Sequence, residues 1–141
     1  MPFSRSLIVA VAVQIACQLF KVVFYSLKQG RLCPDYFVST GGMPSAHTAF
    51  VSALTVSLGL HHGFASEFFT VAFVFSAITV YDLVRVRGAV HAHSRILAML
   101  LEQVQLRQKI TLPHLVSHSI PEILAGLVVG CGLGVAAYYL I

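Results

Sequence analysis

The stretch LIVAVAVQIACQLFKVVFYSL, residues 7–27, decides the fold class of this chain. A transmembrane helix needs about 17–25 mostly apolar residues, and this stretch has that length and composition. It is too long for the apolar core of a signal peptide and lacks a clear small-residue cleavage site. We therefore expect it to be retained as a membrane-spanning helix.

The composition of the whole chain agrees with a membrane protein. Of the 141 residues, 57% are hydrophobic and 10% are charged, whereas soluble domains carry about 25% charged residues. The mean hydropathy is +0.85. We therefore predict one all-α transmembrane domain over residues 1–141, a polytopic bundle of about four transmembrane helices plus one amphipathic interfacial helix. The three cysteines are far apart and predict neither a disulfide framework nor a metal motif.

Three further segments are candidate spans, at approximately residues 45–61, 67–84 and 120–141. The segment 45–61 is the weakest of them, because it is short and rich in Ser, Thr and Ala. Within approximately 94–110, apolar residues recur at helical spacing and charged residues occupy the opposite face. This pattern predicts an amphipathic helix on the membrane surface.

The Lys and Arg residues predict the orientation in the membrane. With four spans, one side of the membrane holds seven of the nine cations: Lys28, Arg31, Arg85, Arg87, Arg95, Arg107 and Lys109. The positive-inside rule makes this side cytoplasmic, or its matrix or stromal equivalent, and places both termini on the other side. We expect membrane lipids as partners, because basic residues at a membrane face attract anionic headgroups. We expect no nucleic acid, because the chain has a net charge of +4 but no soluble domain whose basic surface could bind it.

Several polar residues stand inside predicted spans, where ionisable groups are costly and often functional. Lys21 belongs to a polar stripe on the first span, and Asp82 ends a Ser-Thr-Asp stripe on the third. For these two residues a structural and a functional role are equally plausible. The small residues spaced by four predict close helix packing only; they are Ser45, Ala49, Ala53 and Ser57, and Gly126, Gly130 and Gly134.

The segment STGGMPSAHTAF, residues 39–50, carries the strongest chemical pattern. Gly42 belongs to a loop that can expose backbone N–H groups, and Ser45 and His47 follow at the start of a helix. A helix N-terminus binds anions, most often phosphate, and a histidine there can protonate a leaving oxygen. The alternative is a helix cap with an incidental histidine.

Two more segments complete the pattern. In HSIPEILAGLVVG, residues 118–130, His118 and Glu122 lie four positions apart, so the carboxylate can orient the imidazole; the alternative is an acidic first turn of a helix. In YDLVRVRGAVHAHSR, residues 81–95, Arg85 can pair with Asp82, and the arginines suit a phosphate. The alternative there is a solvated loop. With Lys21, the three segments can converge on one cleft.

GGMPSAHTAF followed by HxxxE-ILAGxxxG resembles the type 2 phosphatidic acid phosphatase superfamily, and most closely its divergent branch of small membrane proteins. The resemblance implies an all-helical fold and a reaction that needs no metal or cofactor. It implies that His118 attacks phosphorus to form a phosphohistidine, that Glu122 orients His118, and that His47 protonates the departing alcohol. The oxygens of the phosphate would be held by Lys21, Gly42, Ser45 and Arg87, with Asp82 and Arg85 in support.

The resemblance leaves two main hypotheses. The first is a metal-independent lipid-phosphate or polyprenyl-(di)phosphate phosphohydrolase. The second is a catalytically impaired homologue that serves as an accessory subunit of a larger membrane protein complex. It is suggested by residues 85–93, where Arg85 stands at a usual glycine and Gly88 at a usual second arginine. A histidine-rich metal or haem site is a weaker third idea.

Overall fold

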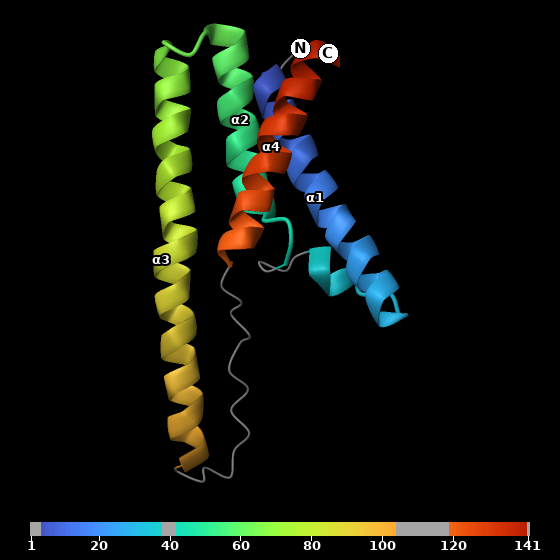
Figure 1. Cartoon of the computed structure of the whole chain (residues 1–141), viewed down its shortest axis with the longest axis vertical. Coiled ribbons are helices and arrows are strands. Elements are labelled where there is room, and N and C mark those ends of the chain that lie inside the picture. The colour runs from blue at the N-terminus through green and yellow to red at the C-terminus, as the bar shows by residue number, and fades with distance from the viewer. Residues whose placement is uncertain (1–3, 38–41, 104–118, 141) are drawn as a thin grey trace.

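The computed structural model describes residues 4–37, 42–103 and 119–140. Within these ranges the chain forms helices and no strand, which confirms the all-α prediction (Figure 1). The elements are α1 (Arg5–Gln29), a short 3-10 helix η1 (Pro34–Phe37), α2 (Ala46–His62), α3 (Glu67–Gln103) and α4 (Ile120–Leu140). By length and composition, α1, α3 and α4 can each cross a membrane.

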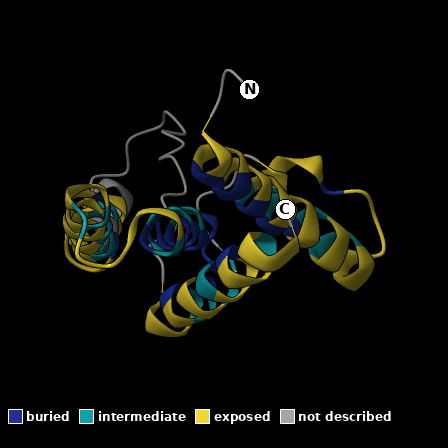
Figure 2. Cartoon of the chain, turned by 90° about the horizontal axis from the view of Figure 1, so that it is seen from above, coloured by how far each residue is buried: buried dark blue, intermediate teal, exposed yellow. Residues whose placement is uncertain are grey.

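Helix α2 occupies the centre of the bundle. It has 17 residues and packs against α1, α3 and α4, so most of its surface is buried (Figure 2). Its hydroxyl groups bond to carbonyl oxygens: Ser52 Oγ donates to Thr48 O at 2.7 Å and Thr55 Oγ1 to Val51 O at 2.8 Å. The Ser, Thr and Ala content that weakens the sequence signal for this span is therefore what allows a short helix to be surrounded by three others.

Glycines of α4 pack directly against the backbone of α2. A Cβ atom at Gly126 would lie 2.5 Å from Ser45 O, and one at Gly134 would lie 3.2 Å from Ala53 O. Gly130 faces Ala49 between these two contacts. Residue numbers rise together along both helices, so α2 and α4 run parallel and their N-termini lie at the same end. The predicted small-residue stripes are confirmed as one packing surface.

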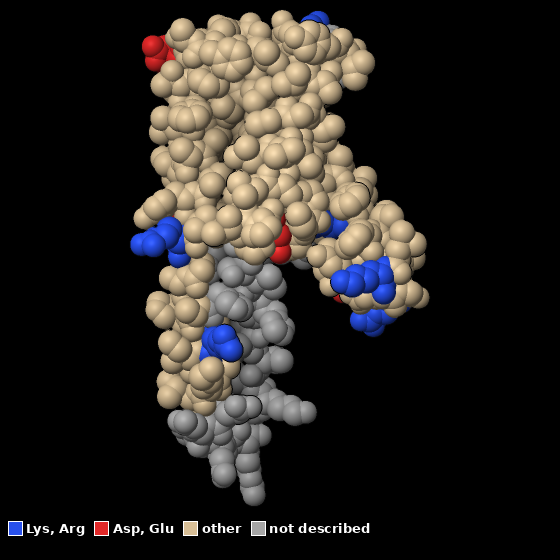
Figure 3. Space-filling view, in the orientation of Figure 1, with Lys and Arg blue, Asp and Glu red and all other residues tan. Residues whose placement is uncertain are grey.

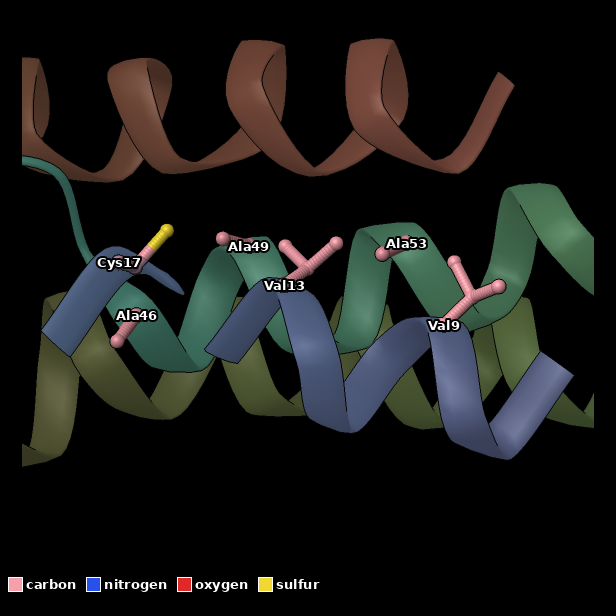
Figure 4. Packing of buried hydrophobic residues seen from close by; sticks show 6 residues of the cluster. All are labelled: Val9, Val13, Cys17, Ala46, Ala49 and Ala53. Carbon is pink, nitrogen blue, oxygen red and sulfur yellow. The ribbon is translucent and has the colours of Figure 1, made fainter. Parts of the chain in front are cut away.

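A small apolar core joins α1 to α2. Val9, Val13 and Cys17 recur at four-residue spacing on α1 and face the buried alanines of α2, as Figure 4 shows. The alanines are Ala46, Ala49 and Ala53. Because their side chains are small, the two helices can approach closely enough to leave these residues less than a tenth exposed.

Helix α3 is longer than the predicted third span. It continues without a break from Glu67 to Gln103, so residues 94–103 belong to the same helix as residues 67–84, while an interfacial position for this part stays a prediction. No proline interrupts this segment, and its length of 37 residues corresponds to about 55 Å. That exceeds the hydrocarbon core of about 30 Å. The rest of the predicted interfacial helix, residues 104–110, lies outside the described ranges.

Charge is divided between the two ends of the bundle. Both chain termini lie at one end in Figure 1, and the N-termini of α2 and α4 lie at the other. On the face drawn in Figure 3, the Lys and Arg side chains gather toward the second end, apart from one beside the termini. The division matches the cation count in the sequence, while the assignment of this end to the cytoplasm stays a prediction.

Candidate functional site

The starts of α2 and α4 are joined by a backbone hydrogen bond. Ser45 N donates to Glu122 O at 3.0 Å, although the two residues are far apart in the chain. Ser45 is fully buried, and its Oγ caps α2 by accepting bonds from Thr48 N at 3.4 Å and Thr48 Oγ1 at 3.0 Å. The cap of α2 at Ser45 and the first turn of α4 at Glu122 therefore meet.

The first turn of α4 is capped by Glu122. Ser119 N donates to Glu122 Oε2 at 3.3 Å, which is the glutamate half of a capping box. Glu122 N donates to the backbone carbonyl O of Ser119 at 3.1 Å. The bond from Ser119 N fixes the position of the Glu122 carboxylate beside the start of the helix, so the acidic first turn that the sequence allowed is present.

Lys21 brings α1 to the same place. Its side chain is 1% exposed, and its charge lies within electrostatic range of Glu122. A buried lysine inside a span is costly unless it has a charged partner or a ligand. Glu122 of α4 thus relates Lys21 of α1 to Ser45, the cap of α2, and these three residues are called the three-helix cluster.

The loop before α2 is held by an aromatic residue that sequence reasoning did not single out. Gly42 has φ of +90°, and a Cβ atom there would lie 3.1 Å from Tyr25 Oη. The Tyr25 ring stacks on Tyr36 with centroids 4.3 Å apart. Tyr25 therefore fixes the glycine loop from the side of α1. The available signal was its place in the polar stripe, four residues after Lys21.

His47 lies on another side of α2 from Ser45. Two positions along a helix correspond to about 200° of rotation, so Ser45 faces α4 while His47 faces α3. There His47 lines a cavity of about 330 Å³ together with Thr79, Asp82 and Leu83. The structure thus places His47 and Asp82 in one cavity on the α3 side of α2. The three-helix cluster lies on the α4 side of α2, and the convergence of both sets on one cleft stays a prediction.

Two predicted residues are not placed in this arrangement: His118 lies outside the described residues, as does the side chain of Arg87. Asp82 and Arg85 are both exposed on α3, and their pairing stays a prediction. Of the His, Cys, Asp and Glu residues in the described ranges, no three could hold a metal ion.

Comparisons with known proteins found a family and a relative that are similar to this chain. The Divergent PAP2 family matches residues 3–133 of the chain. An uncharacterized membrane protein of Bacillus subtilis (strain 168), YuiD, is 38% identical over 81 residues, which cover 57% of this chain. The match spans about half of that relative, 51% of its length. No solved structure matches the chain.

Proposed function

Because the chain belongs to the Divergent PAP2 family, we propose that it is a metal-independent membrane phosphohydrolase acting on lipid phosphates or polyprenyl (di)phosphates. The observation that carries the proposal is the three-helix cluster. Lys21 is 1% exposed and within electrostatic range of Glu122, whose backbone oxygen accepts the bond from Ser45 N. A buried cation at the meeting point of two helix N-termini favours an anion, and phosphate is the usual occupant of such a place.

The proposed reaction has two steps. An imidazole nitrogen of His118 attacks phosphorus and the bond to the lipid oxygen breaks. His47 stands at the start of α2, two positions from Ser45, and in this scheme it turns from the α3 side to give its proton to the departing alkoxide. Water then attacks the phosphohistidine and gives a proton to His47, the P–N bond breaks, and inorganic phosphate leaves. Phosphoryl transfer depends mainly on positioning and charge stabilisation. In this scheme Lys21, Arg87 and the Gly42 N–H stabilise the phosphate oxygens.

The buried groups hold the reacting ones in place. Ser45 caps α2 and bonds to Glu122 O, so its contribution is to keep the glycine loop against the start of α4. Glu122 sits in the first turn after His118 and orients it in the proposed reaction. Asp82 lines the same cavity as His47 and supports the imidazolium form during proton transfer.

Phosphate release from a mixed panel of lipid phosphates and polyprenyl diphosphates, with EDTA present, tests the proposal. We expect release by the wild type and its loss in His118→Ala. His62→Ala is the matched control, because His62 is exposed at the opposite end of α2 and should leave the rate unchanged. Equal rates for wild type and His118→Ala across the panel, with both proteins folded, would refute the proposed reaction.

The altered segment at residues 85–93 favours a second candidate, an accessory subunit on the same scaffold. It lies on α3, whose apolar side chains are largely exposed. This candidate predicts stable co-purification with a larger complex in native-like lipid. A solitary monodisperse protein would contradict it, and phosphate release lost in His118→Ala would favour the enzyme.

A further inference from the structure

An apolar groove lies between α1 and α4 on the side away from α3. In Figure 1 these two helices cross near the chain termini and diverge toward the opposite end. The groove has a volume of about 670 Å³ and is lined by Cys17, Phe20 and Tyr25 of α1, by Pro44, and by Ala125 and Val129 of α4, among others. We propose that this groove receives one hydrocarbon chain of the lipid phosphate whose phosphate lies at the three-helix cluster.

The groove borders the cluster on every element that contributes to it. On α1, Lys21 lies one turn from Cys17 and one turn from Tyr25, and both of these line the groove. In the loop, Pro44 lines the groove immediately before Ser45. On α4, Ala125 lines it one turn after Glu122. A lipid whose anionic headgroup is bound at the cluster can therefore place its chain in the groove.

The cation beside the groove and the apolar lining of the groove suit one chain of an anionic lipid. A phosphate at Lys21 has a cation beside it, while the groove itself is lined almost wholly by apolar side chains, which suit a hydrocarbon. The volume of the groove, about 670 Å³, is enough to hold one long hydrocarbon chain.

The free energy that favours the groove over the bulk bilayer comes from the phosphate headgroup and not from the hydrocarbon chain. Lipid tails are as apolar as the side chains of the groove, so a chain gains little by leaving the bilayer. A chain without a phosphate has no reason to prefer the groove to other lipid-facing surfaces. This inference rests on the proposed function for the identity of the headgroup.

Photocrosslinking in lipid nanodiscs tests the inference with the full chain. The probe is a single-chain lysophosphatidate with a diazirine in its acyl chain, and the comparison probe is the monoacylglycerol with the same chain. We expect the phosphate probe to label peptides that contain residues 16–25 and 125–133, several-fold more than the comparison probe does. Equal labelling by both probes, or labelling spread evenly along α3, would show bulk lipid only and would overturn the proposal.

Two matched pairs of variants fill the groove or spare it. Ala16→Phe and Leu133→Trp enlarge side chains that line the groove, while Ile15→Phe and Leu127→Trp enlarge exposed neighbours that do not. Leu133 and Leu127 are 42% and 41% exposed on the same helix, so their replacements are matched in setting. Steric overfilling should lower groove labelling at least about fivefold. Labelling unchanged in both groove variants would refute the proposal.

The readout separates this inference from the proposed function. Crosslinking does not require turnover, so groove labelling by a protein that releases no phosphate would support the groove and contradict the proposed function. Phosphate release by a protein whose groove is not labelled would contradict the groove alone. Circular dichroism of each variant shows whether it is folded before either result is interpreted.

Discussion

Replacing Gly126 by alanine places a methyl group against the backbone of α2. Its Cβ atom would lie 2.5 Å from Ser45 O and 3.0 Å from Thr48 Cβ. A carbonyl oxygen in a helix cap cannot rotate away as a flexible side chain can, so α2 and α4 must separate. Their separation lengthens the hydrogen bond from Ser45 N to Glu122 O, which joins the two halves of the proposed site.

Gly132 provides the matched control on the same helix, because nothing lies within 4 Å of a Cβ atom placed there. Both exchanges gain about 1 kcal/mol of helix propensity, so this contribution cancels when the two variants are compared. Overfilling a packed interior costs about 1–3 kcal/mol. We therefore expect Gly126→Ala to be about 1–3 kcal/mol less stable than Gly132→Ala. Gly134→Ala should fall between them, because its closest contact is 3.2 Å.

Titration with SDS in mixed micelles measures these free energies of unfolding. The chain contains no tryptophan, so helicity by circular dichroism is the suitable signal. Phosphate release measured on the same variants shows whether the site depends on the α2–α4 contact, and we expect it to fall in Gly126→Ala alone. Equal stability of Gly126→Ala and Gly132→Ala would refute the close packing of α2 on α4.

Three further predictions concern the residues around the three-helix cluster. Lys21→Met should lower phosphate release by about 10²–10³-fold, the usual loss when one charge-stabilising donor is removed; an unchanged rate would exclude Lys21 from the site. Glu122→Gln should release phosphate more slowly but keep the cap of α4, since Gln also serves in a capping box. Glu122→Ala should also lose about 1 kcal/mol of unfolding free energy, and equal stability of the two variants would contradict the cap. Tyr25→Ala should lose about 0.5–1.5 kcal/mol of stacking on Tyr36 and release phosphate more slowly, whereas Tyr25→Phe keeps the ring and should behave as wild type. Identical rates of phosphate release in the two variants would contradict a role of Tyr25 in holding the Gly42 loop.

The sequence predicts the bundle well where a physical requirement leaves a local pattern. Apolar length marks α1, α3 and α4, because a span must match the bilayer. The spacing of Gly126, Gly130 and Gly134 predicts close packing, because only small residues allow two backbones to meet. Pairing this stripe with the one beginning at Ser45 required the structure, because the spacing on one helix does not identify its partner.

The candidate site is only partly predictable for a related reason. The motif around Ser45 and the cap at Glu122 can be recognised from neighbouring residues, since capping is local. The burial of Lys21 beside Glu122 depends on how α1 crosses α4, which no local pattern encodes. The continuation of α3 through residues 94–103 could not be predicted, because an amphipathic pattern fits a separate surface helix and the end of a longer helix equally well.

Rapid quenching with a radiolabelled lipid phosphate tests the central claim most directly. A phosphohistidine is stable in base and labile in acid, so labelled protein can be distinguished from bound substrate after denaturation. The account predicts base-stable label on the wild type and on His62→Ala, and none on His118→Ala. Phosphate release without any labelled protein, or label that persists in His118→Ala, would contradict it.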